Sequence, residues 1–204
     1  MRGASRQPEG LAAARRAAAA LAAAAALAAA AALAACGGAR APAPSGPSVQ
    51  VRAEIEQAEA AERARQHDAA RAHYERAVAG ARDPTSLAFA RREYAETLIS
   101  WGEHPAAIAQ LEGSLAARPS AAAWHDLGLL RNNQGDVRGA LAALEQARAL
   151  APRDPRPRVA LAALRWKSGD RAGATAEYRA LLELPLPERL RAKVQWALDE
   201  LAKP

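Results

Sequence analysis

The side chains that could support catalysis or bind a metal are one cysteine, four histidines and 22 aspartates and glutamates. A single cysteine, Cys36, excludes a disulfide within the chain and a zinc site of the multi-cysteine kind. His67 and His73 are six residues apart and fall on different faces of a helix, while His104 and His125 are isolated in the sequence. The spacing of the histidines therefore predicts no metal site.

The carboxylates do not form a catalytic set either. They lie in segments of helical periodicity, where acidic side chains usually form a solvated face. The chain has no glycine-rich loop between a strand and a helix that would bind a nucleotide, and no serine in the context of a nucleophile elbow. The sequence therefore predicts no enzymatic activity, no cofactor and no small-molecule substrate.

Cys36 ends a segment that has the organisation of an export signal. Four arginines in residues 1–16 precede an uncharged alanine and leucine run over residues 17–35, which closes with Leu33-Ala34-Ala35-Cys36-Gly37. This closing stretch resembles the lipobox of bacterial lipoproteins, in which the cysteine becomes the lipidated first residue of the mature chain. The resemblance implies a lipoprotein signal peptide over residues 1–35 and a covalent lipid on Cys36.

A second interpretation of residues 17–35 is an uncleaved transmembrane helix, because the uncharged run is close to the ~20 residues that a span requires. Alanine contributes little apolar area, so the lipoprotein interpretation is favoured. The resemblance then implies a protein held at the cell envelope by its acyl chains. Gly37 stands where an aspartate often retains such proteins at the inner membrane, so we expect the outer membrane, on its periplasmic side.

The residues that follow Cys36 predict a flexible linker. The range 36–48 is rich in proline, glycine and alanine and has no apolar periodicity. The formal net charge is +6, but four arginines and one glutamate before Cys36 account for half of it, and later charges are interspersed in sign. No basic stripe is interleaved with aromatic residues, so nucleic acid is not an expected partner.

Beyond the linker the sequence repeats itself. Gly102, Gly135 and Gly169 recur at intervals of 33 and 34 residues, and each is followed five residues later by an alanine. Each unit continues with a large apolar or aromatic residue and closes near a proline. The members of these series are Ala107, Ala140 and Ala174, then Leu111, Leu144 and Tyr178, then Pro119, Pro152, Pro185 and Pro187.

This pattern resembles the tetratricopeptide repeat, whose units are antiparallel helix pairs. The unit with Trp124, Leu127 and Gly128 matches best, because it has the large, large and small residues of the family's first helix. The resemblance implies an all-α fold: an α-solenoid of about four helix pairs plus a C-terminal capping helix. The units fall at about residues 51–84, 88–120, 121–154 and 155–187, within a repeat region over 49–187, and the capping helix falls at 188–204.

In this family the first helix of each unit faces the inside of the superhelix. Residues spaced three, four and three along those helices would line a groove for a protein or peptide partner. Arg92, His125, Asn132 and Lys167 would supply donors, and Phe89 and Trp166 apolar anchors. The expected groove residues are Phe89, Arg92, Glu96, Ile99, Ala122, His125, Leu129, Asn132, Arg156, Val159, Ala163, Trp166 and Lys167.

A lipobox joined to a short repeat array is similar to small envelope lipoproteins that help assemble pilus secretins or recruit cell-wall hydrolases. The leading hypothesis is therefore a non-catalytic scaffold, tethered to the envelope, that binds envelope proteins or peptide segments and assists assembly of a pilus or secretin complex. Two alternatives remain open. One is a regulatory adaptor of a peptidoglycan-processing enzyme, and the other is a repeat protein anchored in the inner membrane.

Overall fold

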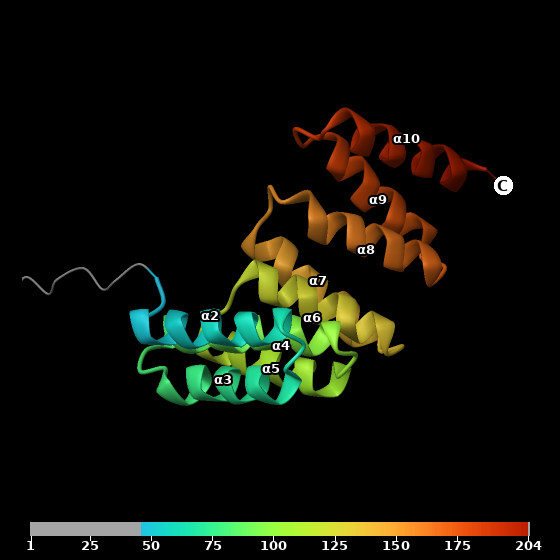
Figure 1. Ribbon diagram of the computed structural model, residues 1–204. Helices are drawn as coiled ribbons and strands as arrows, with labels where there is room; N and C mark the ends of the chain where they lie inside the picture. Colours follow the sequence, from blue (N-terminus) through green and yellow to red (C-terminus); the bar gives the residue numbers. More distant parts are fainter. Residues whose placement is uncertain (1–45, 204) are drawn as a thin grey trace, which may run out of the picture. The chain divides into compact units, whose positions relative to one another are not determined.

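The computed structural model describes residues 46–203 (Figure 1). All regular secondary structure in that range is α-helical, which confirms the predicted fold class. The predicted signal peptide, Cys36 and the linker as far as residue 45 lie outside the described residues. The helices of the described range are α2 (Val49–Arg63), α3 (His67–Gly80), α4 (Pro84–Ser100), α5 (His104–Ala117), α6 (Ala121–Asn133), α7 (Val137–Leu150), α8 (Pro155–Lys167), α9 (Arg171–Leu182) and α10 (Glu188–Ala202).

The helices from α2 to α9 form successive hairpins, in which a first helix (α2, α4, α6 or α8) packs on the second helix that follows it. Each second helix also packs on the next first helix, and α9 packs on α10 in the same way. The chain therefore stacks helix pairs in sequence order, as Figure 1 shows.

Polar caps fix where the first helices begin. Ser48, Asp83, Ser120 and Asp154 are their N-cap residues, and the side chain of each accepts a hydrogen bond from a backbone N–H of the first turn. Such a cap stabilises a helix by about 1 kcal/mol. Pro84, which the repeat spacing places at the end of the first unit, is instead the first residue of α4 and so opens the second pair.

The turn inside each pair requires a left-handed backbone. Gly102, Gly135 and Gly169 have φ angles of +77°, +83° and +88°, a region that glycine enters without a steric cost. The first pair has no glycine there, and Arg65 adopts the conformation instead with φ of 59°. An arginine in this region costs roughly 1 kcal/mol, so the packing of α2 on α3 imposes the turn.

The core contains small residues where first helices approach their neighbours. Ala58, Ala95 and Ala162 are fully buried, and Gly128 is buried at the corresponding place on α6. A methyl group added at Gly128 would lie 2.7 Å from Cγ of Leu144 on α7. Leucines fill the space between these small residues. The largest buried members of this set are Leu98, Leu111, Leu127, Leu144, Leu161 and Leu181.

The last helix, α10, covers the apolar face that α9 leaves open. Val194, Ala197 and Leu201 are buried against α9, and most of the exposed side chains of α10 are polar. Trp196 is a large apolar side chain on the exposed face, with 61% of its surface exposed. Within residues 46–203, no helix combines the length and the apolar character needed to cross a membrane.

One buried glutamate joins the third and fourth pairs through three arginines. Glu177 on α9 is 4% exposed and accepts hydrogen bonds from Arg148 on α7 and Arg158 on α8. Nη1 of Arg158 lies 3.0 Å from its Oε2, and Nη1 of Arg165 on α8 lies 3.6 Å from its Oε1. The carboxylate therefore compensates charges on two other helices at once.

Replacing this carboxylate should destabilise the solenoid. Glu177→Gln keeps the shape of the side chain but leaves the arginines without their shared counter-charge, and we expect the free energy of unfolding to fall by roughly 2 kcal/mol. Glu145→Gln is the control, because the side chain of Glu145 is 45% exposed and, within residues 46–203, its one ion pair is with Arg165. It should change the free energy by less than about 0.5 kcal/mol. Denaturant unfolding followed by circular dichroism measures both, and equal midpoints would contradict the prediction.

Candidate functional site

Two adjoining hollows lie along the first helices. Every residue that lines them belongs to α4, α6, α8 or α10, and none comes from a second helix. Leu129 on α6, which is 40% exposed, lines both hollows. The first helices therefore form a continuous groove, with Leu129 as the ridge between its two parts.

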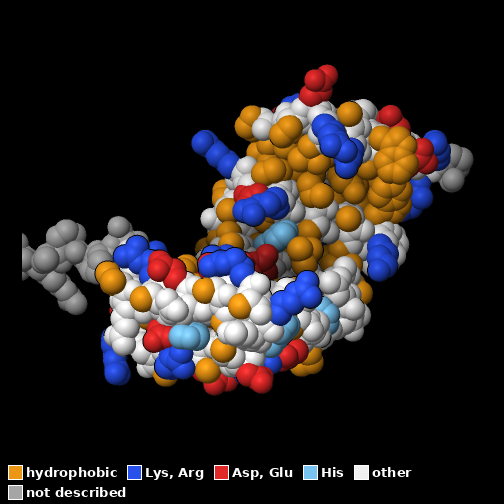
Figure 2. All heavy atoms as spheres, in the orientation of Figure 1, with side chains coloured by type: hydrophobic (Ala, Val, Ile, Leu, Met, Phe, Trp, Pro, Cys, Tyr) orange, Lys and Arg blue, Asp and Glu red, His pale blue; other side chains and the backbone are white. Residues whose placement is uncertain are grey.

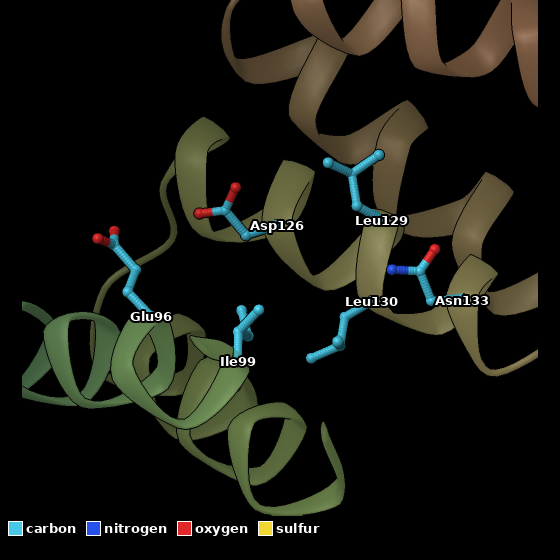
Figure 3. A pocket seen from close by; sticks show the side chains of 6 residues that line it. All are labelled: Glu96, Ile99, Asp126, Leu129, Leu130 and Asn133. Carbon is cyan, nitrogen blue, oxygen red and sulfur yellow. The ribbon is translucent and has the colours of Figure 1, made fainter. Parts of the chain in front are cut away.

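The acidic hollow lies between α4 and α6 and has a volume of about 340 Å³. Figure 3 shows the carboxylates of Glu96 and Asp126 on one side of the apolar side chains of Ile99 and Leu130. The side chains of Glu96 and Asp126 are 49% and 30% exposed, so both carboxylates face solvent at the rim. The full lining is Glu96, Ile99, Asp126, Leu129, Leu130 and Asn133.

The apolar hollow lies between α6 and α8, reaches α10, and has a volume of about 400 Å³. Its lining contains no carboxylate and consists of His125, Leu129, Pro155, Arg156, Val159, Ala160, Ala163 and Leu190. Figure 2 shows hydrophobic side chains gathered over α8 to α10, whereas the face of α2 to α5 seen in the same view mixes charged and neutral side chains. The groove thus changes character along its length.

The arginines near the groove already form ion pairs with carboxylates of this chain. On α4, Arg92 donates hydrogen bonds to Glu93, the next residue in the sequence, and to Glu96, one turn further along the helix. Burial raises the pKa of Glu93, an effect that the charge of Arg92 opposes. At the other end, Nη2 of Arg156 lies 2.7 Å from Oδ2 of Asp154, and this hydrogen-bonded pairing lowers the pKa of Asp154.

Seven of the predicted groove residues line the two hollows. They come from α4, α6 and α8, and their spacing along each helix is the three or four residues that one helical face requires. The structure therefore brings together Glu96, Ile99, His125, Leu129, Arg156, Val159 and Ala163.

The predicted aromatic anchors lie elsewhere. Phe89 is half-buried and packs against the core of the first three pairs. Trp166 packs edge-on against Tyr178, with ring centroids 6.3 Å apart, and lies 6.2 Å from the ring of Trp196 on α10. Both side chains act in packing between helices. The other predicted residues outside the two linings are Arg92, Ala122, Asn132 and Lys167.

The sequence pattern missed residues that lie beside the predicted stripe or outside the repeats. Asp126, Leu130 and Asn133 each follow a predicted position on α6 by one residue and turn toward α4. A single stripe cannot include them, because α6 borders a hollow on each side. Leu190 reaches the apolar hollow from α10, which the spacing within the repeats does not describe.

The groove linings combine apolar side chains with a few charged and amide groups. In residues 46–203, no three histidine, cysteine, aspartate or glutamate side chains gather closely enough to hold a metal ion. The shift in the pKa of Glu93 has a local explanation in burial and neighbouring charges. The arrangement of apolar floor and charged rim is suited to holding part of another chain.

No protein-family model and no curated protein matches the chain. Several solved structures, however, are similar to it. MamA superposes with a TM-score of 0.60 at 17% identity over 74% of this chain and 86% of its own. YrrB, described as a TPR protein with an unusual peptide-binding site, gives 0.58 at 18% identity over 72% of this chain and 74% of its own. The first TPR of Spaghetti (RPAP3), bound to an HSP90 peptide, superposes with a TM-score of 0.51 at 18% identity. This match covers 57% of this chain and 96% of the RPAP3 chain.

These similarities define the class of fold. The chain is an all-α solenoid of the tetratricopeptide type, as the repeat spacing of its glycines and alanines predicts. Two of these neighbours are described as TPR proteins, RPAP3 in complex with an HSP90 peptide and YrrB with an unusual peptide-binding site.

Proposed function

We propose that this protein is a non-catalytic scaffold that binds an extended or helical segment of a partner protein along α4, α6 and α8. The observation that carries the proposal is Leu129, an exposed leucine shared by two adjoining hollows that only first helices and α10 line. Contiguous exposed apolar surface marks an interaction site more than a single exposed leucine does, and Leu129 joins the apolar side chains that line the two hollows. The HSP90 peptide bound to the RPAP3 repeat domain and the peptide-binding site described for YrrB support this use of the groove.

The energetics of the groove suit moderate affinity. A leucine or phenylalanine side chain transferred from water into the apolar hollow contributes roughly 2 kcal/mol. Several such contacts must offset the loss of freedom of the bound segment. A partner segment with one anchor in each hollow would therefore bind more tightly than either half alone.

We further propose that the protein is tethered to the cell envelope through a lipid on Cys36, on the periplasmic side of the outer membrane. The supporting observations are the arginine-rich start, the uncharged run over residues 17–35 and the lipobox-like stretch that ends at the single cysteine. Two or more acyl chains suffice for stable anchoring. The part of the predicted linker that precedes Ser48, the N-cap of α2, would then separate the solenoid from the bilayer.

The partner that we propose is a component of an envelope assembly of the pilus or secretin type. The support is the combination of a lipobox-like stretch with a short repeat array. A scaffold held at the membrane raises the local concentration of a partner that assembles there. Its function is then to hold the partner at the site of assembly.

A single substitution in the groove should remove partner binding. Leu129→Arg places a charge on the ridge between the hollows, and we expect crosslinked capture of the partner from membranes to fall at least about tenfold, the equivalent of 1.4 kcal/mol. Leu150→Arg is the matched control, because Leu150 is 50% exposed at the end of α7, outside both hollows. Equal recovery of the same partner by both variants, each with unchanged helicity, would contradict the groove as the binding site.

A second substitution tests the tether. Cys36→Ser removes the thiol that would carry the lipid. We expect mass spectrometry to find that the parent protein begins at an acylated Cys36, without residues 1–35, and that the Cys36→Ser protein carries no acyl group. A parent protein that keeps residues 1–35 and carries no acyl group would instead support the transmembrane interpretation of residues 17–35.

A further inference from the structure

Acidic side chains gather at one end of the groove. Glu59 on α2, Glu93 and Glu96 on α4 and Asp126 on α6 lie on successive first helices. Burial raises the pKa of Glu93, and repulsion from Glu96 on the same helix and from Glu59 on α2 adds to the rise. The result is a negative potential over the part of the groove that contains the acidic hollow.

The arginines at this end do not balance the carboxylates. Arg92 donates to both Glu93 and Glu96, and Arg63 lies 3.7 Å from Glu59 at the exposed end of α2. Asp126 contacts the ring of His125, with Nδ1 and Oδ1 3.3 Å apart. Because one guanidinium serves two glutamates, the acidic end retains unbalanced negative charge.

The acidic side chains of the groove lie on α4 and α6, and the lining of the hollow beyond α6 has none. Glu93 and Asp126 occupy corresponding places on α4 and α6, whereas Ala160 occupies that place on α8. The apolar hollow beyond Leu129 has no carboxylate in its lining, and the side chain of Arg156 at its edge is already paired with Asp154. The two halves of the groove therefore favour different side chains.

The acidic hollow fits a long cationic side chain. Ile99, Leu129 and Leu130 provide an apolar surface for the methylene stem of a lysine or arginine, and the carboxylates of Glu96 and Asp126 lie at the rim where its charged head would emerge (Figure 3). Arg92 can release Glu96 to such a ligand because it keeps its hydrogen bond to Glu93. Both rim carboxylates would then accept hydrogen bonds from the bound cation.

We infer that the groove recognises a peptide segment in which a lysine or arginine is followed or preceded by a bulky apolar residue, the cation over Glu96 and Asp126 and the apolar side chain in the hollow of Leu129, Val159 and Leu190. The inference rests on the proposed function and names the chemistry of the partner. An acidic segment would meet like charge at Glu93, Glu96 and Asp126, so the same surface discriminates against it.

The test uses the full-length protein in detergent and three pools of short synthetic peptides. The basic pool carries two lysines and a Leu-Phe pair, separated by alanine spacers of varied length. The acidic pool has glutamates in place of the lysines, and the neutral pool has alanines. We expect the basic pool to bind at least about tenfold more tightly than the acidic pool, with an advantage that shrinks as salt screens the carboxylates.

Paired variants assign the effect to the rim. The double variant Glu96→Gln/Asp126→Asn should bind the basic pool about tenfold more weakly than the parent protein does. Its affinity for the neutral pool should be unchanged. Glu183→Gln with Asp199→Asn is the control of equal charge, because both residues are exposed and lie outside the groove linings. This control should bind both pools with the affinity of the parent protein.

The outcomes separate this inference from the proposed function. Equal affinity for basic and acidic pools, an equal effect of the two double variants, or binding of none of the pools overturns the inferred chemistry. In each of those cases the groove itself stands if capture of the natural partner still depends on Leu129. If capture does not depend on Leu129, the proposed function fails as well.

Discussion

The close approach of helices at four small residues is the constraint on which the solenoid depends. Ala58, Ala95, Gly128 and Ala162 lie at corresponding places on successive first helices, and all are buried. At Gly128 a larger side chain would push α6 away from α7, because a Cβ there would lie 2.7 Å from Cγ of Leu144. The repeated small residue therefore fixes which face of each first helix is buried and which remains for a partner.

The orientation of these helices also sets the chemistry of the groove. Glu96, Leu129 and Ala163 each follow a buried small residue by one position, so the repeat places them in a row along successive helices. The row changes from charged to apolar, and the same change occurs from Asp126 to Ala160. A regular backbone thus presents a groove whose side chains change from charged to apolar along its length. The change is possible because packing between helices does not constrain these side chains.

The sequence predicted the elements that depend on local spacing and failed where distant segments meet. The turn glycines recur in the last three units and the buried alanines in all four, so the helix pairs and a stripe of groove residues follow from them. Trp166 packs between helices because α10 brings Trp196 close to it, and Glu177 is compensated by arginines from two other helices. Asp126 and Leu130 were missed because α6 borders two hollows. The prediction for Cys36 falls outside the described residues.

The most direct test of the packing constraint compares two glycine-to-alanine changes by denaturant unfolding. Helix propensity alone predicts that both gain stability. At Gly80 the new methyl meets nothing closer than 3.7 Å, so that variant should be as stable as the parent or more so. At Gly128 it would lie 2.7 Å from Leu144 Cγ and 3.2 Å from the carbonyl oxygen of Ala140, and the free energy of unfolding should fall by about 1 kcal/mol. A Gly128→Ala protein stabilised as much as Gly80→Ala would contradict the constraint.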